Sequence, residues 1–163
     1  MIRNAAKALI ISDKKILMMK CQNTVVDMLH DLPVGAIYYD LPGGGQNQYE
    51  TLEEAVAREC LEETGYTINV DKLAAVYEEI FMNEGFRAAW GDYAHKVHFL
   101  FACRVANEPA EPPAEVDFDM LEAKWVDLAD VTADFPLHPL IIRDNLRQVL
   151  DSEHTLYLGS ARY

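Results

Sequence analysis

The chain has 163 residues, half of them hydrophobic, which is the size of one domain with a full core. It carries 14 Lys and Arg residues against 27 Asp and Glu residues, for a formal net charge of -13. Binding to a long polyanion relies on basic side chains that release counterions, so this balance disfavours DNA or RNA as a partner. No segment approaches the roughly 20 apolar residues that span a bilayer, so we expect no membrane partner.

The three cysteines are scattered along the chain at Cys21, Cys60 and Cys103. An odd, scattered set is typical of a reducing compartment and of core packing, and not of a disulfide framework. The apolar N-terminal run is followed at once by charged residues, so we expect no signal peptide. The expected location is the cytoplasm.

Apolar runs bounded by turn residues predict the strands. The first two runs are separated by Ser12, Asp13 and Lys14, which predicts a β-hairpin. The expected strands, in chain order, are 5–11, 15–19, 37–41, 68–80, 96–105 and 123–128. Two segments between strands, 21–36 and the acidic stretch 107–122, are predicted to be long loops.

Two helices are expected. Thr51 followed by Glu54 fits a capping box, segment 52–63 contains neither Gly nor Pro, and Gly65 suits a left-handed C-terminal cap. A closing amphipathic helix is predicted at 137–150, and the tail after it forms a strand or an arm. Interleaved strands and helices predict an α/β sandwich on a mixed sheet, in a single domain, 1–163.

The first of these helices carries three acids on one arc. Glu59, Glu62 and Glu63 stand at i, i+3 and i+4, so their like charges destabilise the helix unless something offsets them. A hard divalent cation such as Mg²⁺ or Mn²⁺ does so, because it prefers carboxylate oxygens. The simpler interpretation of a lone Glu pair is a solvated helix face.

The residues around these acids favour a site over a solvated face. The glycines 43–45 free the backbone to approach a phosphate or to offer a carbonyl oxygen to a cation. Arg58 lies beside the acids and can form an ion pair with Glu50, which would fix the loop against the helix.

The spacing Gly44-x5-Glu50-x7-Arg58-Glu59-x-x-Glu62-Glu63-x-Gly65 resembles the Nudix box of the Nudix (MutT-like) hydrolases. The box covers residues 44–66. The preceding Leu-Pro-Gly-Gly and the Trp-Val-x-Leu segment at 125–128 are also similar to that family. The chain departs from the family pattern at Cys60 and Tyr66, which are packing positions, and at Tyr39, where the family often has Trp.

The resemblance implies a Nudix-type α/β/α sandwich with a central mixed β-sheet. It implies Mg²⁺-dependent hydrolysis of a pyrophosphate bond in a small nucleoside diphosphate derivative, such as a nucleoside triphosphate, ADP-ribose or a nucleotide sugar. By position, the resemblance assigns metal binding to the three glutamates and to the Gly43 carbonyl, and the structural ion pair to Glu50 and Arg58. Substrate contacts fall to Gly44, Gly45 and, through its changed aromatic ring, Tyr39.

Several alternatives stay open at this point. The general base is Glu59 or an acid of the loop 107–122; the candidate loop acids are Glu115, Asp117, Asp119 and Glu122. Glu78, Glu79, His95 and His98 are interpreted as solvated or structural residues. A nucleotide-sensing module that keeps the fold without turnover is the alternative function. The apolar tail 155–163 and the habits of the family are compatible with a homodimer.

Overall fold

The structure is a computed structural model that describes residues 1–24, 32–108 and 119–163. The described residues form strands β1 (Arg3–Ser12), β2 (Lys15–Gln22), β3 (Ile37–Asp40), β4 (Gly43–Gly45), β5 (Thr67–Ile80), β6 (His95–Asn107), β7 (Met120–Asp127) and β8 (Leu156–Arg162). The helices are α1 (Leu52–Thr64), α2 (Glu84–Ala89) and α3 (Leu140–Asp151), with a 3-10 turn η1 (Gly91–Tyr93).

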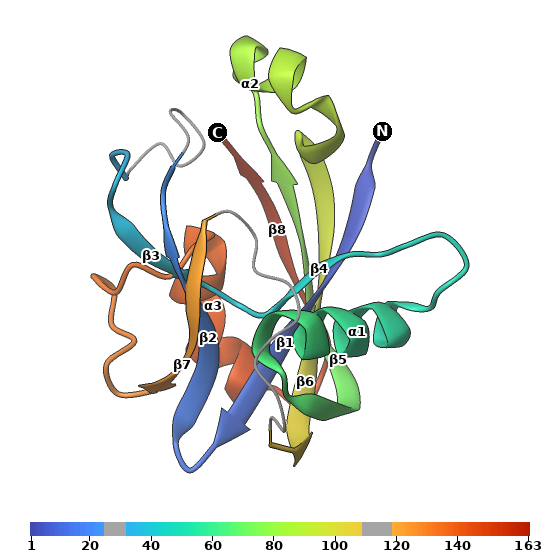
Figure 1. Cartoon of the computed structure of the whole chain (residues 1–163), viewed down its shortest axis with the longest axis vertical. Helices are drawn as coiled ribbons and strands as arrows, with labels where there is room; N and C mark the ends of the chain where they lie inside the picture. The colour runs from blue at the N-terminus through green and yellow to red at the C-terminus, as the bar shows by residue number, and fades with distance from the viewer. Residues whose placement is uncertain (25–31, 109–118) are drawn as a thin grey trace.

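The strands form one mixed sheet in the order β3-β2-β1-β6-β5-β8, with β4 paired to β1 and β7 paired to β2. The β1–β6 and β5–β8 pairs are parallel, whereas the β1–β2, β1–β4 and β5–β6 pairs are antiparallel. Figure 1 shows both chain ends at the end of the sheet where α2 lies.

Two helices cover the sheet on opposite faces, because alternate residues of each strand point to opposite sides. Ala6, Ala8 and Ile10 of β1 pack with the buried face of α1. Leu9 points the other way and packs in the cluster that contains the buried face of α3. The result is the expected α/β/α sandwich with a mixed sheet, and α1 lies across β1 and β6 in Figure 1.

The sequence predicts the N-terminal hairpin and α1 closely. Asp13 and Lys14 have the positive φ angles, 49° and 64°, of a tight hairpin turn. At the start of α1, the Thr51 side chain accepts the Glu54 N–H and the Glu54 side chain accepts the Thr51 N–H. Gly65 ends the helix in the left-handed conformation. The predicted capping box and C-terminal cap are both confirmed.

Other elements differ from the prediction. Glycines 43–45 form strand β4, because β1 supplies their hydrogen-bonding partners. The connection between β5 and β6 contains α2, which the Asn83 side chain caps. Strand β7 begins within the predicted loop 107–122, because Met120 pairs with Cys21 of β2. Helix α3 begins three residues later than predicted, since Leu137 forms a β-bridge with Tyr39, whose backbone bonds to Pro136 and His138.

Candidate functional site

The candidate site lies where β4 runs beside α1. At Gly43 the φ angle is +123°, and a Cβ atom would overlap the carbonyl oxygen of Ala6. At Gly44 a Cβ atom would stand 2.5 Å from Oε2 of Glu59. A side chain at either position would therefore push β4 away from β1 or from the Glu59 carboxylate, and glycine is required for both approaches.

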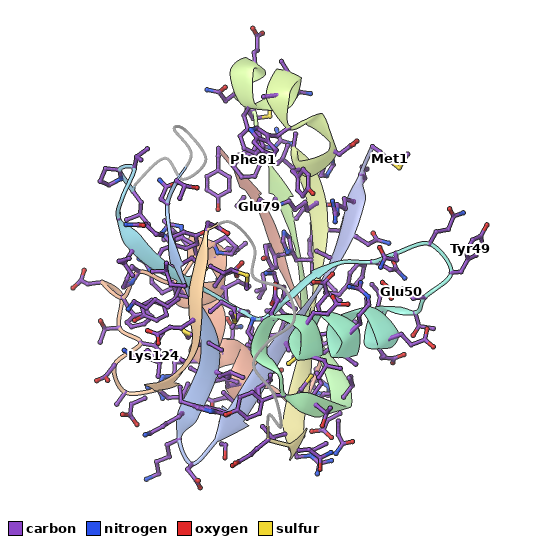
Figure 2. The ribbon with its side chains drawn as sticks, viewed as in Figure 1. Met1, Tyr49, Glu50, Glu79, Phe81 and Lys124 are labelled. Carbon is purple, nitrogen blue, oxygen red and sulfur yellow. The ribbon has the colours of Figure 1, made fainter. Side chains whose placement is uncertain are left out.

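Arg58 gathers three acids and the glycine strand. Its Nε and Nη2 donate to the two carboxylate oxygens of Glu50, at 3.1 and 2.7 Å. Its Nη1 donates to Glu59 at 2.8 Å and to Glu62 at 2.9 Å, and Nη2 also donates to the Gly45 carbonyl at 3.0 Å. The predicted ion pair between Arg58 and Glu50 is present, and it joins the loop before α1 to the helix. Figure 2 shows Glu50 beside α1.

These contacts set the charges of the group. The hydrogen bond from Arg58 lowers the pKa of Glu50 below its ordinary value. The same pairing, together with Glu59 and Glu62, raises the pKa of Arg58 although burial acts against it. The bidentate geometry is the strongest form of such a contact. The guanidinium thus neutralises part of the repulsion among the acids, a role that the sequence alone assigned to a divalent cation.

Glu63 lies at the other end of the glycine strand. Its carboxylate accepts the Gly43 N–H at 2.8 Å. Burial raises the pKa of Glu63 to about 7, and the nearby charge of Lys7 opposes this shift. Lys7 itself donates to Asp40 at 2.8 Å and to the Leu41 carbonyl at 3.0 Å.

The three α1 acids do not converge on one point in this structure. Among the residues that the structure describes, no three His, Cys, Asp or Glu side chains are grouped closely enough to hold a metal ion. Glu59 and Glu62 share one nitrogen of Arg58, and Glu63 faces Gly43. The donors are nevertheless all oxygens, namely the carboxylates of α1 and the Gly43 carbonyl of the adjoining strand β4. That donor chemistry fits a hard divalent cation.

Two of the loop acids considered from the sequence have partners outside α1. Asp119 accepts a hydrogen bond from the hydroxyl of the buried Tyr38. Glu122 forms an exposed ion pair with Lys20 at 3.2 Å. The remaining candidates for the general base, Glu115 and Asp117, lie outside the described residues.

Tyr39 packs away from the α1 acids. Its ring lies against Phe135 with the centroids 4.9 Å apart, and it borders the core cluster on the α3 face. The two changed box positions are packing residues as predicted: Cys60 is fully buried, and the Tyr66 hydroxyl accepts a hydrogen bond from the Trp125 indole at 3.0 Å.

The interpretation of Glu79 as a solvated acid is wrong. Glu79 is only 7% exposed, and its carboxylate lies 3.3 Å from Nε2 of His98 and 3.6 Å from Nζ of Lys96. Burial alone would raise the pKa of Glu79, but His98 and Lys96 lower it to about 2. Burial lowers the pKa of His98, and its imidazole stacks on the Tyr77 ring at 4.4 Å. Figure 2 shows Glu79 further up the sheet than α1.

The partners of Glu79 stand 17 and 19 positions along the chain, and they meet it only through the register of β5 and β6. The sequence offers no local signal for this cluster.

Among the described residues, no helix combines the length and apolar character needed to cross a membrane.

Comparison with known proteins gives the family. Residues 1–147 match the model of the NUDIX domain. Putative nudix hydrolase 1 of Caenorhabditis elegans is 31% identical over 93 residues, which are 57% of this chain and 21% of that protein. The chain therefore spans about a fifth of the length of this curated relative.

Solved structures show the same fold. A MutT NUDIX hydrolase from Burkholderia pseudomallei is 26% identical, with a TM-score of 0.59 over 94% of this chain and 99% of that chain. An ADP-ribose pyrophosphatase from Streptococcus suis is 18% identical, with a TM-score of 0.62 over 95% of this chain and 98% of that chain. The family model covers nearly the whole sequence, and the box residues lie on β4, on α1 and in the segments next to them. This chain belongs to the NUDIX domain family.

Proposed function

We propose that this chain, as a single domain, hydrolyses a phosphoanhydride bond in a small nucleoside diphosphate derivative. Nucleoside triphosphates, ADP-ribose and nucleotide sugars are the candidate compounds. The observation that carries the proposal is the meeting of the α1 acids with the glycine strand, where Arg58 contacts Glu59, Glu62 and Gly45 together. Family membership and the name of the Streptococcus suis relative support the same class of substrate.

The carboxylates of Glu59, Glu62 and Glu63 and the carbonyl oxygen of Gly43 would hold Mg²⁺, for which Mn²⁺ can substitute. Their oxygen donors suit such an ion. When bound, Mg²⁺ supplies charge neutralisation for the diphosphate and activation of the attacking water. An all-oxygen donor set on a single helix and its adjoining strand is what supports this assignment.

The remaining chemistry belongs to the chain itself. Arg58 orients Glu59 and Glu62, and its pair with Glu50 holds the loop in place. The backbone of Gly44 and Gly45 lets a phosphate approach without a side chain in the way. Positioning of this kind, together with electrostatic stabilisation, supplies most of the catalysis in phosphoryl transfer.

We propose Glu59 as the group that accepts the proton of the attacking water, because its carboxylate lies directly against Gly44. Among the described residues, Asp119 and Glu122 are the alternatives from the acidic loop. Glu59→Gln should lower kcat strongly, whereas Asp119→Asn should leave kcat within a few-fold of the native value. A larger loss of kcat for Asp119→Asn than for Glu59→Gln would instead indicate that the base is an acid of the loop 107–122.

The reaction is tested with purified protein, Mg²⁺ and a panel of nucleoside triphosphates, dinucleotides and nucleotide sugars, with the products identified by mass spectrometry. We expect cleavage of at least one compound, and a loss of about 100-fold or more in kcat for Glu62→Gln. Glu53→Gln, which changes an exposed acid in the first turn of α1, is the matched control. No cleavage by the native protein, or equal cleavage by Glu62→Gln, would contradict the proposal; tight nucleotide binding without turnover would favour a sensing module.

A further inference from the structure

The glycine strand is flanked by several cations, and most of them are already paired. Arg58 is engaged by the α1 acids, Lys7 by Asp40, and Lys96 by Glu79. The remaining cation is Arg3, at the start of β1. Within residues 1–24, 32–108 and 119–163, the Arg3 side chain forms no hydrogen bond or ion pair.

Arg3 is nevertheless held in place. Its guanidinium carbon lies 4.6 Å from the centre of the Tyr93 ring. An added Cβ atom at Gly45 would overlap Nη2 and stand 2.5 Å from Nε and 2.7 Å from Cζ of Arg3, so the Nε–Nη2 edge of the guanidinium faces the Gly45 backbone. Tyr93 and Gly45 thus hold the guanidinium in position. The fork formed by Nη1 and Nη2 is the edge that remains available to a ligand.

This fixed fork lies beside the candidate site. The Gly45 carbonyl accepts a hydrogen bond from Arg58, which also binds Glu59 and Glu62. Arg3 is thus separated from the α1 acids by a single glycine. In a chain with a net charge of -13, a diphosphate approaching these acids needs a cation that is not already neutralised. The guanidinium fork matches phosphate oxygens in geometry as well as charge.

We propose that Arg3 is a phosphate-binding residue, which holds an oxygen of the substrate's diphosphate group beside β4. Tyr93 and the bare backbone of Gly45 fix its guanidinium for this purpose. The proposal rests on the proposed function for the identity of the substrate. A fork that is ordered before binding loses less entropy when the phosphate arrives.

The test uses two probes that need no turnover: inorganic pyrophosphate, and a nucleoside diphosphate with a methylene group between its phosphorus atoms. Their dissociation constants are measured by calorimetry with Mg²⁺ present. Arg3→Gln should weaken binding by about tenfold, the value of one hydrogen bond to a charged group. Arg3→Lys keeps the charge but loses the fork, so it should give an intermediate loss. Arg104→Gln is the control, because it removes one positive charge at the far end of β6, where Arg104 pairs with Asp71.

Gly45→Ala provides an independent arm. Its Cβ atom would displace the Arg3 guanidinium, which is the flexible end of a long side chain, so the fold should be kept. We expect Gly45→Ala to weaken pyrophosphate binding, and the double variant with Arg3→Gln to bind no more weakly than Arg3→Gln alone. Non-additivity of this kind means that the two changes act through the same contact.

Native binding of pyrophosphate by Arg3→Gln would overturn the proposal and leave Arg3 as a packing residue against Tyr93. Equal weakening by Arg104→Gln would also overturn it, because net charge would then explain the effect. The proposed function fails separately. If the native protein binds pyrophosphate through Arg3 but cleaves no compound of the panel, the phosphate contact stands and hydrolysis does not. If the native and Arg3→Gln proteins cleave a substrate with the same KM, hydrolysis stands and the phosphate contact does not.

Discussion

Glu79 is a buried carboxylate on β5, and the groups that face it from β6 and β1 keep it ionised. Lys96 and His98 contact it directly, and the charge of Lys7 acts from β1. A carboxylate at this depth would ordinarily take up a proton, because burial favours its neutral form. Two contacts from the neighbouring strand reverse that preference. The register between β5 and β6, which brings these groups together, therefore determines the charge of Glu79.

This residue makes stability depend on acid. The folded pKa of Glu79, about 2, lies below its ordinary value of 4.5, which we take for the unfolded chain. A lowered pKa contributes stability that is present above the unfolded pKa and is lost as the pH falls towards the folded pKa. We expect Glu79 to account for a loss on the order of 2 kcal/mol in the free energy of unfolding between pH 6 and pH 3.

The underlying pKa can be measured by following the Glu79 carboxyl carbon in an NMR titration. We expect it to stay ionised down to about pH 2. Lys96→Met should raise this midpoint, since Lys96 is one of the two groups that hold it down. Lys15→Met, at the exposed start of β2, should leave it unchanged. A midpoint near 4.5 in the native protein would show that the cluster does not hold the charge.

Two neighbouring glycines of strand β4 are needed for different reasons. The positive φ angle and the contact with the Ala6 backbone make Gly43 necessary for the strand itself. Gly44 has no positive φ angle, and its missing side chain makes room only for the Glu59 carboxylate. Adjacent glycines in one three-residue strand thus serve the fold and the site separately.

Alanine at each position should distinguish these uses. Gly43→Ala should lower the free energy of unfolding by several kcal/mol, because backbone atoms cannot move aside. Gly44→Ala should cost far less stability, since the Glu59 side chain can rotate away, but it should lower kcat with the panel substrates by about tenfold or more. Urea unfolding and steady-state kinetics measure the two effects. Comparable stability losses for both variants would contradict this division.

The elements that the sequence predicts well are those with local signals. Thr51, Glu54 and Gly65 mark both ends of α1, so its bounds are predicted to within one residue. The three glycines of β4 lack the alternating apolar and polar side chains that predict a strand. Their pairing with β1 comes from the tertiary fold. Helix α2 has only six residues, one of them a glycine, so local propensity gives little signal.

The candidate site likewise contains contacts that the sequence predicts and contacts that it does not. The box spacing predicts the ion pair between Glu50 and Arg58, because only seven residues of loop and helix separate them. The position of Arg3 is not predictable from spacing, since Gly45 and Tyr93 approach it from distant parts of the chain. Contacts that depend on strand register or on a stacked ring become visible only in the folded structure.

The chain contains 27 acidic and 14 basic residues. Any dissolved cation screens the excess negative charge to some extent. A site-bound cation acts differently, because it stabilises only the folded state, by RT ln(1 + [L]/Kd). At about 100 times the dissociation constant this amounts to about 2.7 kcal/mol. The two effects of a divalent salt can therefore be separated by matching ionic strength.

We expect Mg²⁺ to raise the Tm by several degrees above the value in NaCl of equal ionic strength, and EDTA to reverse the change. The increment should be lost in Glu62→Gln, because that change removes one proposed ligand, and kept in Glu53→Gln, because the first turn of α1 lies outside the proposed set. Differential scanning fluorimetry over a Mg²⁺ titration measures both. Equal shifts in the two salts would mean that Mg²⁺ only screens the net charge. A specific shift that survives in Glu62→Gln would place the cation elsewhere in the molecule, since the excess of acids offers it many weaker positions. The α1 group is the proposed position because it combines several acids with the glycine backbone of β4.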